Sequence, residues 1–259
     1  MTTSSSGNPQ PAPGVPASPD SERTARLCAE TALFMRDHVL SVVSHDLRSP
    51  LNAIHSWAYV LERKLEATDA TAERAIVGIR NGVEQQVKLL ETIVDATRAE
   101  TKALTLARVP FALRPLVDAT VAEVRAALAD SRGVTIAVNS TPADQTFSGD
   151  AERLAQVLWL MLTFAVEASA REASVTLESA VDGTTWHTTV TFAPTPAAFG
   201  DATLPHLLEA FARRQAQEPR EAGRIAWVLA LCKRIAEAHG GKFEQNDVSL
   251  VLRVPLAAA

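Results

Sequence analysis

Residues 44–51 bring together an unusual density of reactive groups in one short segment. His45 carries an imidazole, Asp46 a carboxylate, Arg48 a guanidinium and Ser49 a hydroxyl. A neutral imidazole near pH 7 is a nucleophile, and a carboxylate that holds its second N–H fixes the tautomer and stabilises the cation formed on attack. The segment therefore predicts a histidine that accepts a phosphoryl group, with Asp46 as its partner.

A long helix must position these groups, because apolar residues recur around them at intervals of three and four. His45 lies about 200° around the helix from this apolar seam, so it should point outward, with His38, Ser49 and Asn52 on the same outer face. Pro50 removes a backbone N–H and should bend the helix just beyond the histidine. Most such histidines are only surface residues, but the bend, the acid and the hydroxyl favour a functional one. The seam consists of Leu40, Val43, Leu47, Leu51, Ile54, Ala58, Leu61 and Leu65.

A second amphipathic helix should follow a short polar turn and pair with the first one. Its apolar residues have the same spacing, so the simplest structure is an antiparallel helical hairpin. One hairpin would leave its seam half exposed, whereas two hairpins related by a two-fold axis would form a four-helix bundle. We therefore expect a homodimer. The apolar positions of the second helix are Ile76, Ile79, Val83, Val87, Leu90, Val94 and Thr97.

The pattern changes at about residue 104 to a mixture of strands and helices. Helices are expected over residues 113–129, 151–170 and 225–238, the second with Asp150 as its cap and the third stopped by His239 and two glycines. Strands are expected over residues 134–138, 174–177, 188–192, 242–244 and 249–254. This mixture predicts an α+β sandwich with helices on one face of a mostly antiparallel sheet.

Composition narrows the class of protein. A chain of 259 residues with 47% hydrophobic side chains can form two structural units. Its net charge of -5 argues against a dedicated nucleic-acid binder. Cys28 and Cys232 lie about two hundred positions apart, and neither has a His or Cys nearby at the spacing of metal ligands. We therefore expect two reduced, buried thiols and neither a disulfide framework nor a zinc site. Since no apolar run is long enough to span a membrane, we expect a cytoplasmic protein.

Residues 44–51 closely resemble the phospho-acceptor box of sensor histidine kinases, usually written S-H-[ED]-L-R-[TS]-P-L, and every position fits. The resemblance covers residues 34–255. It implies a dimerisation and phosphotransfer bundle followed by a domain of the histidine-kinase and Hsp90-like ATPase type, with His45 phosphorylated and Asp46 as its acid/base neighbour. The expected divisions are a disordered tail over 1–20, the bundle over 21–103 and a degenerate catalytic-like domain over 104–259.

The second domain departs from the family pattern at its recognisable ATP elements. Leu160 and Phe164 stand where the N box has two asparagines, and hard cations need oxygen ligands that Phe cannot provide. Glycines in the family's two glycine boxes let the backbone approach the ligand, and side chains there cost roughly 1–2 kcal/mol. Pro194 stands where the first box has an aspartate, Pro196 and Ala198 stand where it has glycines, and Trp227 and Val228 fall within the second box. These changes predict a lost nucleotide site filled by Leu160, Phe164, Trp227 and Val228, and therefore no ATP or Mg²⁺ cofactor.

The favoured function is a phosphorelay protein whose His45 exchanges phosphoryl groups with an aspartate on a response-regulator receiver domain. One alternative is an active ATP-dependent histidine kinase with an atypical pocket. Another is a non-catalytic scaffold that binds a partner histidine kinase through its bundle. A phosphatase role is weaker, because Ser49 replaces the Thr or Asn that the family usually uses to orient water.

For two further sets of residues, we expect a structural or surface role first. Trp57 and Trp159 have the spacing of core residues. Four arginines fall where the family has a lid over ATP, and we expect an exposed loop there, with an anion or partner site as the second reading. They are Arg213, Arg214, Arg220 and Arg224.

Overall fold

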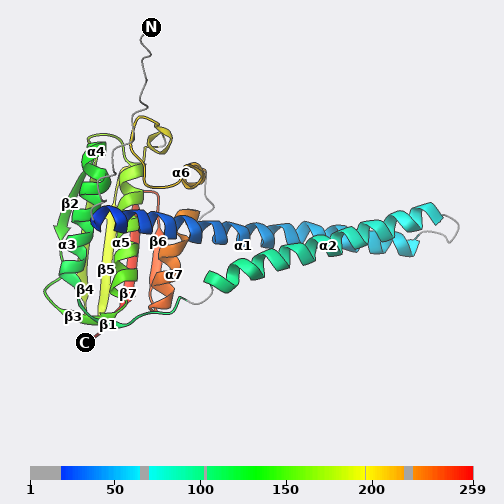
Figure 1. Cartoon of the computed structure of the whole chain (residues 1–259), viewed down its shortest axis with the longest axis horizontal. Helices are drawn as coiled ribbons and strands as arrows, with labels where there is room; N and C mark the ends of the chain where they lie inside the picture. The colour runs from blue at the N-terminus through cyan, green and yellow to red at the C-terminus, as the bar shows by residue number, and fades with distance from the viewer. Residues whose placement is uncertain (1–18, 65–69, 102–103, 196, 219–223, 259) are drawn as a thin grey trace, which may run out of the picture.

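An extended helical hairpin and an α/β domain make up the described part of the chain (Figure 1). The computed structural model describes residues 19–64, 70–101, 104–195, 197–218 and 224–258. The tail expected over residues 1–20 lies outside these ranges, apart from its last two residues, which belong to the first helix. Among the helices in these ranges, none has the length and apolar character needed to cross a membrane.

The hairpin consists of α1 (Pro19–Lys64) and α2 (Ala70–Thr101), and its antiparallel arrangement confirms the expected pairing (Figure 1). α1 begins at Pro19, where a proline is well tolerated because the first helical N–H has no partner in the helix. Pro50 lies inside α1, which continues as one helix on both sides of it. The long helix therefore carries the reactive segment about halfway along its length.

The face of α1 that contacts α2 is rotated away from the expected seam. Ala58 is buried and Leu51 is half-buried, but most other seam residues are open. On α2, Ile76 and Val83 are buried, and a polar link joins the helices where Glu62 accepts a hydrogen bond from Arg80 at 2.6 Å. Trp57 is 68% exposed, so its assignment to the core was wrong. The open seam residues, between 40% and 53% exposed, are Leu40, Val43, Leu47, Ile54 and Leu61.

The α/β domain contains a five-stranded sheet in the order β2-β4-β5-β7-β6. β2 pairs with β4 in parallel and the other pairs are antiparallel, which confirms the mostly antiparallel sheet. A smaller sheet in the order β1-β3-β8 lies beside it, and its strands were not predicted. The strands are β1 (Val109–Ala112), β2 (Thr135–Ser140), β3 (Thr146–Gly149), β4 (Ser174–Asp182), β5 (Thr185–Thr191), β6 (Lys242–Gln245), β7 (Ser249–Pro255) and β8 (Ala257–Ala258).

Helices cover one face of the large sheet, as expected for the α+β sandwich. On β5 the side chains of Trp186, Thr188 and Val190 are buried, whereas the alternating residues are not, so a single face is covered. The helices are α3 (Leu113–Val124), α4 (Asp130–Arg132), α5 (Ala151–Ala168), α6 (Ala210–Gln217) and α7 (Ala230–Ala238), with the π-helical turn η1 (Arg125–Ala129) and the 3₁₀ turns η2 (Ala198–Gly200) and η3 (Trp227–Leu229).

α5 is the central helix of this layer. Asp150 caps it as expected, since its Oδ1 accepts a hydrogen bond from the Arg153 N–H at 3.1 Å. Trp159 is fully buried, which confirms its assignment to the core. The helix expected over residues 225–238 is shorter in the structure, where α7 begins at Ala230. Cys232 is a buried free thiol, but Cys28 is only half-buried.

Candidate functional site

His45 projects from α1 into solvent, and Asp46 lies beside it. The His45 side chain is 85% exposed, and its Nδ1 lies 3.3 Å from Oδ1 of Asp46. When Nδ1 carries the proton, this N–H donates to the carboxylate and Nε2 presents its lone pair to solvent. The structure thus places the two residues as the sequence predicted, with a nucleophilic nitrogen open to an incoming group.

Arg48 and Ser49 diverge from this pair. The Arg48 guanidinium lies 3.5 Å from the Glu91 carboxylate, so it links α1 to α2. Ser49 is exposed on the outer face, one turn beyond His45. Ser44 is buried, one turn before Arg48 on the side that faces α2. Of the four predicted site residues, the structure therefore brings His45 and Asp46 into contact and gives Arg48 a link between helices.

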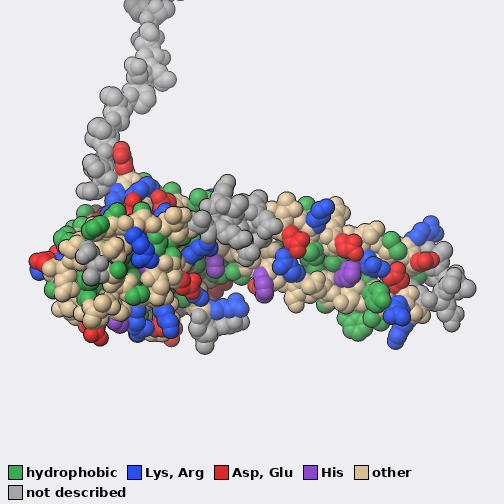
Figure 2. Space-filling model, turned by 90° about the horizontal axis from the view of Figure 1, so that it is seen from below, with side chains coloured by type: hydrophobic (Ala, Val, Ile, Leu, Met, Phe, Trp, Pro, Cys, Tyr) green, Lys and Arg blue, Asp and Glu red, His purple; other side chains and the backbone are tan. Residues whose placement is uncertain are grey.

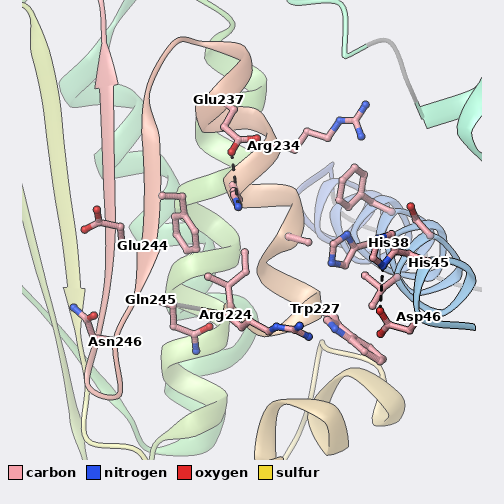
Figure 3. Close-up of a pocket in the computed structure, with 17 residues that line it drawn as sticks. His38, His45, Asp46, Arg224, Trp227, Arg234, Glu237, Glu244, Gln245 and Asn246 are labelled. Carbon is pink, nitrogen blue, oxygen red and sulfur yellow. Dashed lines mark hydrogen bonds and ion pairs between the residues drawn. The ribbon is translucent and has the colours of Figure 1, made fainter. Parts of the chain in front are cut away.

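A cavity of about 780 Å³ lies between the middle of α1 and the α/β domain, and His45 and Asp46 line it. Its other wall comes from α7 and β6 and includes the basic residues Lys233 and Arg234 (Figure 3). The motif at residues 44–51 could not reveal this wall by itself, because α7 and β6 lie almost two hundred residues further along the sequence. The signal that was available is the apolar pattern of residues 225–238, which leaves the charged side chains of this helix on its outer face.

His38 lies in the same cavity, two turns before His45 on α1. Burial lowers the pKa of His38, and the nearby Lys233 ammonium lowers it further. The imidazole of His38 is therefore neutral at pH 7. His38 and Lys233 line the same cavity, and Arg234 of α7 lies over the Phe34 ring of α1, so the two helices come close at this point.

The N-terminal half of α1 binds across the helices of the α/β domain and fixes the cavity. Leu27 and Met35 are each only 1% exposed and belong to the core of that domain. Glu30 accepts hydrogen bonds from Arg153 at 2.9 Å and from Gln156 at 3.0 Å, both on α5. Figure 1 shows α1 crossing this domain before it enters the hairpin. Further ion pairs join Arg23 to Glu123, Arg26 to Glu152 and Arg36 to Glu209.

Apolar side chains occupy the positions where the family has its nucleotide elements. Leu160 is fully buried and Phe164 is 2% exposed. The Phe164 ring lies 6.1 Å from that of Phe192 and 5.3 Å from that of Phe199, measured between centroids. These three rings form one aromatic cluster and offer no oxygen ligand to a cation. Within the described residues, no group of three or more His, Cys, Asp or Glu side chains is placed to hold a metal ion.

Trp227 and Val228 differ in how deeply their side chains are buried. Val228 is buried, as expected for a residue that fills core. Trp227 is only half-buried and packs against the edge of the core. The Trp227 ring lies 6.2 Å from that of Phe211, measured between centroids, and Trp227 also lines the cavity beside His45.

A buried carboxylate that the sequence analysis missed orders the segment before α6. Glu167 is fully buried, and its Oε1 accepts hydrogen bonds from the backbone N–H groups of Leu207 at 2.7 Å and Leu208 at 2.9 Å. Its Oε2 lies 2.8 Å from Nδ1 of His206. The available signal was a single acid within the mostly apolar, buried run 154–168 of α5. Glu167 therefore fixes the backbone of residues 206–208 against α5.

The arginines expected in an exposed loop belong partly to α6. Arg213 is half-buried and donates a hydrogen bond to the Phe199 carbonyl at 2.7 Å, whereas Arg214 is exposed. Arg224 lines the cavity beside His45. Arg220 lies outside the described residues.

Comparisons with known proteins match both parts of this architecture. Residues 35–102 match the model of the His Kinase A (phospho-acceptor) domain. A crystal structure of a histidine kinase from Burkholderia phymatum STM815 is 57% identical, with 92% of this chain and 99% of that chain covered and a TM-score of 0.73.

Curated relatives are more distant and longer. The signal transduction histidine-protein kinase BaeS of Escherichia coli (strain K12) is 26% identical over 86% of this chain and 47% of its own length. The sensor protein GacS of Pseudomonas syringae pv. syringae is 26% identical over 90% of this chain and 26% of its own length. The chain thus spans less than half the length of these two relatives. On the matched phospho-acceptor domain and the 57% identical structure, the chain belongs to the sensor histidine kinase family.

Proposed function

We propose that this chain is a two-component phosphotransfer protein whose His45 exchanges a phosphoryl group with an aspartate on a response-regulator receiver domain. The observation that carries this proposal is the exposed His45 imidazole, held beside Asp46 on the helix of a phospho-acceptor domain. The exposure leaves room for a partner protein to approach, and the carboxylate holds the imidazole in one tautomer.

The chemistry of this step needs little from the chain itself. The Nε2 lone pair attacks the phosphorus of the aspartyl phosphate, the bond between phosphorus and the aspartyl oxygen breaks, and the receiver aspartate leaves as a carboxylate. The product is a phosphorylated imidazolium whose Nδ1 proton faces Asp46. Catalysis then consists mainly of placing the imidazole in line with the bond that breaks.

We also propose that the chain has lost its own ATP site. The aromatic cluster around Phe164 and the buried Leu160 support this, since neither residue can ligate Mg²⁺ and the Phe164 ring packs against Phe192 and Phe199 of the first glycine-box segment. Under this proposal neither ATP nor Mg²⁺ is a cofactor of this chain. Phosphoryl groups must then reach His45 from another protein.

A homodimer is the third part of the proposal. The open apolar residues of α1 form a stripe on the hairpin, and Figure 2 shows hydrophobic side chains gathered on the hairpin surface. Monomeric proteins rarely leave a continuous stripe of this kind in water. A second hairpin would cover it and complete a four-helix bundle.

The deciding experiment supplies two labelled donors separately to wild type and to His45→Ala. One donor is ³²P-ATP with Mg²⁺, and the other is a ³²P-labelled receiver domain, chosen by screening receivers for transfer to the wild-type chain. We expect label from the receiver but not from ATP, and none on His45→Ala. Labelling of His45 from ATP would instead favour the ATP-dependent kinase, and equal labelling of both proteins would exclude His45 as the acceptor.

A further inference from the structure

Trp227 and Phe211 form a partly exposed aromatic pair at the edge of the cavity. Their ring centroids lie 6.2 Å apart, with an angle of 34° between the ring planes. Phe211 is 45% exposed on α6, and Trp227, the first residue of η3, is half-buried. Aromatic side chains are enriched at protein interfaces, where a partner covers their large surface. A pair that stays open to water is therefore a candidate binding surface.

The backbone that carries Trp227 is held in place from two sides. The N–H of Trp227 donates a hydrogen bond to Oε1 of Gln215 on α6 at 2.8 Å. The N–H of Ala226 donates a hydrogen bond to Oε1 of Gln245 on β6 at 2.7 Å. Val228, which follows Trp227 in η3, is buried. The ring is thus presented on a fixed segment, which lowers the entropy cost of binding a partner.

The two elements that carry the aromatic pair are joined to the helix of the nucleophile. η3 packs against α1, and Trp227 lines the same cavity as His45 and Asp46 (Figure 3). Arg36 of α1 donates a hydrogen bond to Glu209, the residue just before α6, at 2.7 Å. The aromatic pair therefore keeps a fixed place beside the reactive imidazole.

A domain that reacts at His45 must lie across the mouth of this cavity. Even a compact domain of about 100 residues has a radius of gyration of about 13 Å. A cavity of about 780 Å³ cannot admit such a domain. When an aspartyl phosphate comes within bonding distance of Nε2, the body of its domain therefore covers the cavity rim, where Trp227 lies with Phe211 next to it.

We propose, building on the proposed function, that the Trp227–Phe211 pair is a docking surface for the incoming receiver domain. Apolar side chains of the receiver cover the two rings while its aspartyl phosphate reaches His45. A receiver that fits this chain thus presents an apolar patch near its phosphorylated aspartate. Through this contact the α/β domain helps to select and hold the receiver, although the reaction itself stays at His45.

The test measures transfer and binding by the full chain, with the receiver chosen in the labelling screen. We expect Trp227→Ala to raise the KM for transfer about tenfold or more, and to raise the Kd of the unphosphorylated receiver in isothermal titration by a similar factor. The kcat should stay within about threefold, because His45 and Asp46 are unchanged. Phe211→Ala should raise both constants about threefold. Trp227→Phe keeps an aromatic ring and should stay within about threefold of wild type.

The matched control is Val109→Ala, which shortens an exposed apolar side chain on β1, outside the cavity lining. It should leave KM and Kd unchanged. If Trp227→Ala does not fold, Phe211→Ala decides the inference, since its ring is the more exposed of the two.

Unchanged KM and Kd in either alanine variant would overturn a docking surface made of both rings, while label on His45 would leave the proposed function standing. A loss confined to kcat would overturn the inference too, because the rings would then act on the reacting groups and not on docking. Equal losses in Val109→Ala would have the same consequence. A wild-type chain that accepts label from no receiver would overturn both the inference and the proposed function.

Discussion

The Asp46 carboxylate acts on His45 through a single contact of 3.3 Å, so its contribution can be isolated by an isosteric change. Asp46→Asn keeps the shape and removes the charge that stabilises the imidazolium formed on attack. We expect transfer from the labelled receiver to slow about tenfold, a modest factor because both side chains are exposed. Ser49→Ala, one turn further along the same face, should stay within about twofold. Equal rates for Asp46→Asn and wild type would mean that the carboxylate plays no part.

Phe164 is the residue whose replacement best separates core packing from ligand binding. Its ring contacts those of Phe192 and Phe199 and is 2% exposed. Phe164→Ala should lower the free energy of unfolding by about 3 kcal/mol or more, since it removes a buried ring and leaves a cavity. Urea denaturation measures this loss. Phe211→Ala, at a ring that is 45% exposed, is the control and should cost much less. A small loss at Phe164 would contradict its place in the core.

At the scale of elements, the turn between α7 and β6 depends on two glycines for different reasons. Gly240 has a φ of 78°, where a side chain costs roughly 1 kcal/mol. A Cβ on Gly241 would lie 2.1 Å from the Arg253 carbonyl oxygen of β7, which cannot move without disturbing the sheet. We therefore expect Gly241→Ala to lower the melting temperature more than Gly240→Ala does. Thermal unfolding of the two variants tests this order, and the reverse order would contradict it.

The start of α5 depends on a neutral histidine at the end of α7. The Asp150 N–H donates to Nε2 of His239 at 3.3 Å, and Nδ1 of His239 lies 2.9 Å from the Ile235 carbonyl oxygen. Burial lowers the pKa of His239 and the nearby Arg108 contributes, although the Ile235 carbonyl and Asp150 oppose them. The unfolded chain therefore binds a proton at a pH at which the folded chain does not.

Stability from this contact is complete above the unfolded-state pKa of about 6.5 and is lost as the pH falls toward the lower folded-state pKa. Urea unfolding between pH 7.5 and 5.5 should show this decline. His239→Gln should be less stable at pH 7.5 and should have a shallower decline. His38, whose pKa is also lowered, adds to the slope in the same direction. A variant His239→Gln with the wild-type slope would exclude His239 as a source of the pH dependence.

At the scale of the whole molecule, local patterns predicted the hairpin helices and the strands of the large sheet, but neither the smaller sheet nor how distant elements meet. Apolar residues at intervals of three and four predicted α1. The outward direction of His45 followed from its angle around the helix to Val43 and Leu47. The same period could not say which helix those apolar residues would meet, and α2 instead contacts a neighbouring face of α1. The burial of Leu27 and Met35 in the α/β domain was equally hidden, since it depends on contacts far along the chain. The cavity beside His45 arises from those contacts, which is why the motif revealed the nucleophile and not its surroundings.

The apolar stripe left open on α1 makes the assembly of two chains testable. Leu47, which is 44% exposed, lies in the middle of the stripe. Burial of a leucine contributes about 1.5–3 kcal/mol, and a two-fold axis counts each position twice. Leu47→Glu should therefore weaken the dimer at least tenfold in analytical ultracentrifugation, whereas Asn52→Glu on the outer face should leave it intact. A wild-type chain that sediments as a monomer at every concentration would contradict the dimer, and the open stripe would then have to meet a partner of another kind.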